Sequence, residues 1–225
     1  MRRTKRSLSA AFASAFFAVA WLSAPMTARA AERAIAAGQA DHARALEHGA
    51  SLASGIEQGR LLMRAGRAWL LAGEAARADD AQTRALAALP GDSALYVDRS
   101  LARRILGKPW DALDDLHRAL DLGPENVEAM VFRAELYRAL GQGDLALDDL
   151  ERALAINPSH PEALYRRGEI RKLAGDWAGA RADWVRLIAL APQSPAAGNA
   201  QAALRVLDQS ASLVRQRPAE LPALR

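Results

Sequence analysis

The stretch VEAMVFRAELYRALGQGDLALDDLERALAINPSH, residues 127–160, recurs in altered form along the chain with a period of 34 residues. Each copy has a glycine near its middle, an alanine five residues later and a proline near its end. These recurring residues are Gly73, Gly107, Gly141 and Gly175; Ala78, Ala112, Ala146 and Ala180; and Pro90, Pro124, Pro158 and Pro192. The chain therefore contains four repeats, at residues 59–92, 93–126, 127–160 and 161–194, and such a period decides the fold of a helical chain.

Each recurring residue type has a mechanical role in a helical hairpin. A glycine just after the last turn of a helix adopts left-handed backbone angles without a Cβ clash, so it ends the first helix. A small alanine in the second helix lets the two helices approach closely. A proline lacks an N–H and pushes the preceding residue out of the helical region, so it stops the second helix. The repeat therefore predicts an all-α fold of antiparallel helix hairpins.

The repeat resembles that of the tetratricopeptide repeat (TPR) family, which has a small residue at position 8, alanines at positions 20 and 27 and proline at position 32. Position 8 here holds Gly66, Ser100, Ala134 and Gly168, and position 27 holds Ala85, Ala119, Ala153 and Leu187. The resemblance implies a right-handed α-solenoid, the TPR superhelix, in which the first helix of every hairpin lines a concave groove.

A departure from the family pattern predicts an ion pair inside each of the last three hairpins. Position 7 is arginine and position 23 is aspartate in these repeats, and the two positions lie eight residues before and after the turn glycine. The expected pairs are Arg99–Asp115, Arg133–Asp149 and Arg167–Asp183. In the first repeat both positions change together, to Ala65 and Ala81. A partly buried pair of this kind fixes the register of two helices.

The N-terminus is typical of an export signal. Residues 1–30 combine a basic start, an apolar run from about Leu8 to Leu22, and the small-residue cleavage site Ala28-Arg29-Ala30. We therefore expect a signal peptide at residues 1–30 and a periplasmic protein without a stable membrane anchor. An uncleaved anchor is the alternative, although the apolar run is shorter than the roughly 20 strongly apolar residues that span a bilayer.

Less regular segments flank the four repeats. Residues 31–58 are expected to be a degenerate N-terminal repeat or cap, because Gly38, Ala43 and Ala50 fall near the turn and alanine positions of a hairpin. Residues 195–208 are expected to form a C-terminal capping helix that shields the last hairpin. Residues 209–225, with two prolines and small polar side chains, are expected to be a mobile tail.

Charge and composition argue against several classes of protein. The formal net charge is +4, but residues 1–30 hold five basic side chains and no acidic one, so the rest carries 25 basic and 26 acidic side chains. That balance disfavours nucleic acid as a partner. The sequence has no cysteine, no phosphate-binding loop and no nucleophile motif, so we expect no enzyme activity, no cofactor and no metal site.

Histidine and tryptophan also favour a structural interpretation. The scattered histidines, which we expect on the solvated surface, are His42, His48, His117 and His160. Four tryptophans, Trp69, Trp110, Trp177 and Trp184, are expected to pack in the core, with Trp110 partly exposed after Pro109, and not to form a ligand cage.

The TPR resemblance implies that positions 2, 5, 6, 9, 12 and 13 of each first helix face the groove. The candidate partner-binding residues are Arg60, Met63, Arg64, Arg67, Val97, Leu101, Arg104, Val131, Phe132, Glu135, Arg138, Tyr165, Arg166, Glu169 and Lys172. This apolar surface of mixed charge suits an extended or helical peptide anchored by a few hydrophobic side chains. Binding through another face of the scaffold is the alternative.

Export and repeat architecture together predict a non-catalytic adaptor in the cell envelope that binds a protein or peptide partner. This function rests on the family resemblance and not on a catalytic site. The alternative is an accessory subunit that binds a small anionic ligand or glycan, with Arg60, Arg64 and Arg67 as its pocket. The sequence predicts no particular partner, pathway or oligomeric state.

Overall fold

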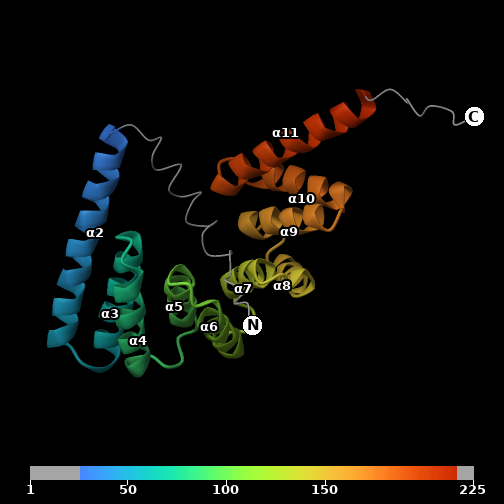
Figure 1. Ribbon diagram of the computed structural model, residues 1–225. Helices are drawn as coiled ribbons and strands as arrows, with labels where there is room; N and C mark the ends of the chain where they lie inside the picture. Colours follow the sequence, from blue (N-terminus) through green and yellow to red (C-terminus); the bar gives the residue numbers. More distant parts are fainter. Residues whose placement is uncertain (1–25, 217–225) are drawn as a thin grey trace, which may run out of the picture. The chain divides into compact units, whose positions relative to one another are not determined.

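The computed structural model describes residues 26–216, and every regular element in that range is an α-helix (Figure 1). The helices are α2 (Met26–Leu52), α3 (Gly55–Leu71), α4 (Ala75–Ala88), α5 (Ser93–Ile105), α6 (Pro109–Leu122), α7 (Val127–Ala139), α8 (Gly143–Ile156), α9 (Pro161–Leu173), α10 (Trp177–Leu190) and α11 (Pro195–Gln216). The expected all-α fold of helix hairpins is confirmed. Most of the expected signal peptide, residues 1–25, and the end of the expected tail, residues 217–225, lie outside the described residues.

The helices group into two compact units. The N-terminal unit, Met1–Pro124, contains the hairpins α3/α4 and α5/α6, with α2 packed on α3 and α4 packed on α5. The C-terminal unit, Glu125–Arg225, contains the hairpins α7/α8 and α9/α10, with α8 packed on α9, and α11 packed on both α10 and α9.

Each hairpin turns at the glycine that the repeat pattern predicted. The φ angles of Gly73, Gly107, Gly141 and Gly175 are 79°, 71°, 78° and 84°. After α5, the N–H of Gly107 donates to the carbonyl of Arg104 at 3.1 Å, and the N–H of Lys108 donates to that of Arg103 at 2.9 Å. These bonds satisfy the last carbonyls of the helix in a conformation that favours glycine. The recurring prolines also act as predicted, since each follows the last residue of α4, α6, α8 or α10 by two positions.

The predicted ion pairs are present in the last three hairpins. Nε of Arg133 donates to Oδ2 of Asp149 at 2.7 Å, and Nη2 donates to Oδ1 at 2.6 Å, so both carboxylate oxygens are bound. The same two-bond geometry recurs in Arg99–Asp115 and Arg167–Asp183. All three aspartates are buried. Each hairpin is therefore locked in register by a planar, charge-assisted contact.

A second arginine, which the repeat pattern did not single out, reaches two of the buried aspartates. Nη1 of Arg103 lies 2.9 Å from Oδ2 of Asp115, and Nη1 of Arg171 lies 2.9 Å from Oδ2 of Asp183. Both arginines stand at position 11, which the third repeat fills with Tyr137. Burial raises the pKa of Asp115 above its usual value, and the two arginines oppose that rise. The second arginine therefore helps to keep the buried carboxyl charged.

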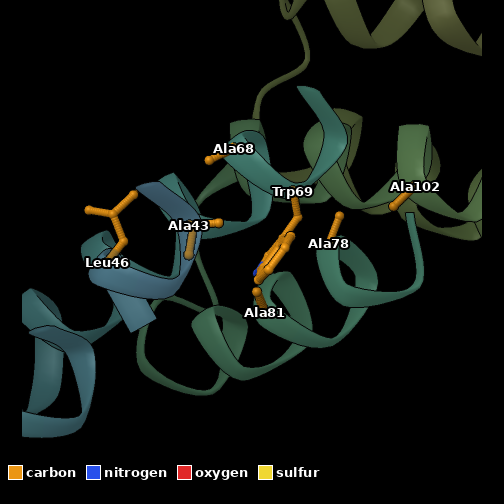
Figure 2. Close-up of a cluster of buried hydrophobic side chains, with 8 residues drawn as sticks. Ala43, Leu46, Ala68, Trp69, Ala78, Ala81 and Ala102 are labelled. Atoms are coloured by element: carbon orange, nitrogen blue, oxygen red, sulfur yellow. The ribbon is translucent and has the colours of Figure 1, made fainter. Parts of the chain in front are cut away.

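The first hairpin replaces the ion pair with apolar contact. Ala65 and Ala81 are both fully buried in a cluster that also contains Trp69. Figure 2 shows the Trp69 ring among alanines of neighbouring helices, including Ala43 of α2 and Ala102 of α5. Because alanine is small, α3 can approach α2 and α4 closely enough for one indole ring to fill the space between them.

Residues 31–58 do not form the expected hairpin. Residues 31–52 belong to the long helix α2, which continues through Gly38, and residues 55–58 are the start of α3. Among residues 30–52, for which burial is described, the buried side chains of α2 all lie after this glycine, at Ala43, Leu46 and Ala50. Residues 31–37 contain a single large apolar side chain, Ile35, so they have no apolar face to bury against a second helix. The second half of α2 therefore packs on α3 as the second helix of a preceding hairpin would.

The helical conformation of Gly38 predicts the effect of Gly38→Ala. Gly38 has helical backbone angles, and an added Cβ would meet no atom within 4 Å. Alanine is about 0.5–1 kcal/mol better than glycine in a helix, so the variant should gain helicity and be slightly more stable in urea unfolding. Were Gly38 the left-handed turn of a hairpin, the same substitution would destabilise the protein instead.

At the other end, α11 extends beyond the capping helix expected at residues 195–208 and includes residues 209–216 of the expected mobile tail. This segment contains neither glycine nor proline, and the next proline is Pro218, so nothing in the sequence stops the helix earlier. The N-terminal part of α11 packs on the last hairpin through Ala196, Ala197 and Ala200, which are buried.

The cleavage site expected after Ala30 falls within the first turns of α2, which begins at Met26. Among residues 26–216, no helix is both long enough and apolar enough to span a lipid bilayer.

Candidate functional site: the first-helix faces of the two units

The first helices of the N-terminal unit, α3 and α5, carry a basic surface. The predicted groove residues that are exposed on it are Arg60, Arg64, Arg67 and Arg104, and those that are half-buried are Met63 and Leu101. Val97 is buried, as is Val131 on α7 in the C-terminal unit, so both predictions of groove residues are wrong. Neighbouring helices cover most of position 5 in every repeat. The short side chain of valine does not extend from there to the solvent, whereas the longer side chains of Met63 and Tyr165 do.

One arginine of the basic surface is already neutralised. Nε of Arg67 on α3 donates to Oδ2 of Asp98 on α5 at 2.5 Å. Burial raises the pKa of Asp98 above its ordinary value, and the bond to Arg67 acts against this rise. The pair ties two neighbouring first helices together. The three-arginine pocket expected for a small anion therefore has only two arginines, Arg60 and Arg64, available on α3.

In the C-terminal unit, Arg166 on α9 stands among three glutamates. It lies 2.8 Å from Glu162, 3.2 Å from Glu169 and 3.6 Å from Glu135 on α7. Burial lowers the pKa of Arg166, but the three glutamates outweigh this effect and raise it. The network carries more negative than positive charge and joins α7 to α9.

A pocket of about 440 Å³ lies beside this network, within the C-terminal unit. The residues that line it are Arg138 of α7; Tyr165, Glu169, Lys172 and Leu173 of α9; Trp184 of α10; and Asn199, Ala202, Ala203 and Val206 of α11. Burial, followed by the neighbouring Glu169, to which its hydroxyl is hydrogen-bonded, raises the pKa of Tyr165 to about 12. The pocket thus combines apolar walls with a few polar and charged groups, the usual make-up of a binding site.

The structure brings four predicted groove residues together in this pocket: Arg138, Tyr165, Glu169 and Lys172. Phe132 is half-buried on α7 and does not line it. The contribution of α11 was missed, because residues 195–208 were expected only to cover the last hairpin. The 34-residue period could have indicated it, because Pro195 follows Pro161 by 34 residues. Continued past Pro195, the period places Asn199, Ala203 and Val206 at groove positions 5, 9 and 12.

Several aromatic and histidine predictions need correction. Trp69 and Trp184 are buried as expected. Trp110 is exposed, beyond the partial exposure expected for it, and Trp177, expected in the core, is exposed as well, so core packing does not account for these two. They stand at the start of α6 and α10, next to the hairpin turns, where no other helix of their own unit covers them. His160 is not a solvated side chain, since its Nδ1 accepts the N–H of Ala163 and caps α9.

Comparisons with known proteins agree with this architecture. Residues 97–160 and 133–195 match the family model of the tetratricopeptide repeat. A tetratricopeptide repeat protein from Parabacteroides merdae is 26% identical with a TM-score of 0.56, and the match covers 68% of this chain and 60% of that one. A thermophilic TPR protein of Thermus thermophilus is 25% identical with a TM-score of 0.57, over 69% of this chain and 81% of that one.

A third similar structure contains a bound peptide. It is the first TPR domain of Spaghetti (RPAP3) bound to the HSP90 peptide SRMEEVD, 25% identical with a TM-score of 0.51, and the match covers 53% of this chain and 95% of that one. A search of curated proteins found no match. With their 34-residue hairpins and turn glycines, residues 97–195 match the tetratricopeptide repeat family, whose fold generally serves as a non-catalytic scaffold for protein–protein interaction.

Proposed function

We propose that this protein is a non-catalytic adaptor that binds a segment of a partner polypeptide on the α7–α9–α11 face of its C-terminal unit. The pocket between α9 and α11 carries the proposal. Its size suits one or two side chains of a peptide, and its walls come from four helices whose positions are fixed by packing. The peptide bound to the similar RPAP3 domain supports a polypeptide as the ligand.

The pocket offers both apolar and polar contacts. Leu173 of α9 and Val206 of α11 both line the pocket and are exposed, so they can cover an apolar side chain. Arg138 and Lys172 form no ion pair with any other described residue, and Nε of Arg138 has no hydrogen-bond partner. These cations can bind carboxylate or carbonyl oxygens of the peptide, and the Tyr165 hydroxyl, whose proton is hydrogen-bonded to Glu169, can accept an N–H group. A short peptide with an apolar anchor and adjacent oxygen acceptors therefore fits the site.

The proposed place of action is the cell envelope. The basic start, the apolar run and the small-residue cleavage site of residues 1–30 support export through a cleaved signal peptide. N-terminal sequencing of the protein recovered from cells should begin at Ala31. An intact N-terminus in the membrane fraction would support the uncleaved anchor instead.

Photo-crosslinking tests the proposed binding face. A photoreactive amino acid is placed at Val206, which is 54% exposed beside the pocket, or at Val185 on α10, which is 50% exposed outside it. Crosslinks to one polypeptide should form from Val206 and not from the matched control. A synthetic peptide from the crosslinked region should then bind the purified protein, and Leu173→Asp should weaken that binding. Equal crosslinking from both positions, or a peptide indifferent to Leu173→Asp, would rule out this face.

A further inference from the structure

A row of arginines runs along α3 in the N-terminal unit. Arg60, Arg64 and Arg67 are spaced by four and three residues, so they lie on one face of the helix. All three are exposed. The first and last are about 10 Å apart along the helix axis, and the first two are about 6 Å apart.

The acidic residues of the same two helices do not balance this row. On α3 the only carboxylate is Glu57 in the first turn, and on α5 the only one is Asp98, which is engaged with Arg67. Arg60 and Arg64 form no ion pair or hydrogen bond with any residue in the range 26–216. Asp92, which precedes α5, is used to cap that helix, where it accepts the N–H groups of Ala94 and Leu95. The side chains of Arg60 and Arg64 are therefore available to carboxylates of another molecule.

Apolar side chains lie at the end of the arginine row. Leu71, in the last turn of α3, is 68% exposed, and Ile105, at the equivalent position of α5, is 61% exposed. Both stand at position 13 of their repeats, next to the turn glycines, so they are neighbours on adjacent first helices. These exposed side chains can cover an apolar residue of a chain bound along the arginine row.

We propose that the α3–α5 face binds an acidic segment of a partner polypeptide, with side-chain carboxylates on Arg60 and Arg64 and an apolar residue against Leu71 and Ile105. Arginine favours this role because its planar guanidinium binds a carboxylate through two parallel hydrogen bonds. Arg60 to Leu71 spans about 16 Å along the helix, which an extended chain covers with about five residues. Alternate residues of such a chain lie about 7 Å apart, close to the spacing of Arg60 and Arg64.

This inference rests on the proposed function in that the ligand is again a polypeptide, but it concerns a different unit and different residues. A small anion could bind Arg60 and Arg64 together, but it would leave the apolar end at Leu71 and Ile105 uncovered. The experiment therefore compares a peptide with a free dicarboxylate, and it treats the two units separately.

Fluorescence anisotropy of the full chain with labelled peptides tests the proposal. The probe alternates glutamate with serine over five residues and ends in two leucines, and both of its termini are capped so that every carboxylate is a side chain. The variant Arg60→Gln/Arg64→Gln should weaken binding about tenfold or more, and raising the salt from about 50 to about 200 mM should weaken it several-fold. The control Arg186→Gln/Arg205→Gln removes two exposed arginines of the C-terminal unit and should change the affinity less than about twofold.

A charge-reversal variant controls for the possibility that the substitutions simply unfold the protein. The variant Arg60→Glu/Arg64→Glu should lose the glutamate peptide and gain a matching peptide with lysine in place of glutamate. The proposal is overturned if a glutamine peptide binds as well as the glutamate peptide, if the Arg60/Arg64 variants keep full affinity, or if free succinate competes as well as the peptide. Leu173→Asp should leave this binding unchanged, so failure at the pocket of the C-terminal unit and failure here are distinguishable.

Discussion

Asp149→Ala is expected to lower the free energy of unfolding by about 3–5 kcal/mol. Asp149 is buried between α7 and α8 and binds both donor groups of Arg133, at 2.7 and 2.6 Å. Without this carboxylate, the largely buried guanidinium of Arg133 loses the partner that offsets its desolvation. A free charge in such a place costs more than the pair contributes when intact, so removal of one partner is the most damaging change. Urea unfolding followed by circular dichroism measures the effect.

A double-mutant cycle separates the pair from other effects of the substitution. Arg133→Ala/Asp149→Ala should lose less stability than the sum of the two single variants, by about 1–3 kcal/mol, because no unpaired charge remains. Asp148→Ala is the matched control, since Asp148 is the exposed neighbour on the same helix and should change stability by less than about 0.5 kcal/mol. Strictly additive single effects would show that the two side chains do not act as a pair.

Gly168→Ala is expected to destabilise the protein by about 1–3 kcal/mol through overpacking. Gly168 on α9 faces Trp184 on α10, and an added Cβ would lie only 2.4 Å from Nε1 of the indole. That nitrogen also donates to the carbonyl of Tyr165 at 3.2 Å, so the ring cannot shift without losing its bond. Because Trp184 and Tyr165 both line the proposed peptide pocket, peptide binding should weaken together with stability.

The control for this variant is Gly198→Ala on α11. Gly198 is also helical and an added Cβ there meets nothing within 4 Å, so alanine should be neutral or stabilising by up to about 1 kcal/mol. Thermal unfolding of the two variants side by side gives the comparison. If Gly168→Ala were as stable as Gly198→Ala, the close contact with Trp184 could not be what keeps position 168 free of a side chain.

The features that the sequence predicted well are those whose chemistry repeats. Gly141 and Pro158 have one local role each, and their spacing alone places the two helices of a hairpin. Arg133 and Asp149 were paired correctly because both lie eight residues from the same glycine, and antiparallel helices bring such positions together. In each case a local rule and a fixed distance along the chain determine the structure.

The features that the sequence did not predict depend on what lies opposite a residue. Gly38 looks like a turn glycine, but residues 31–37 have no apolar face, so the helix continues through it. Val97 occupies a groove position and is buried because its side chain is too short to leave the contact between helices. The walls that α11 adds to the pocket, such as Asn199 and Val206, carry no motif of their own, and only their register with the preceding repeat indicates them.

Heating should affect the first hairpin differently from the other three. Ala65 and Ala81 hold the first hairpin by apolar contact, whereas the later hairpins each contain a buried arginine–aspartate pair. Hydration of charged groups becomes less favourable as the temperature rises, so the cost of keeping such a pair away from water falls on warming. The later hairpins therefore retain more of their stability when warm, and we expect thermal opening of the repeats to begin at α3 and α4.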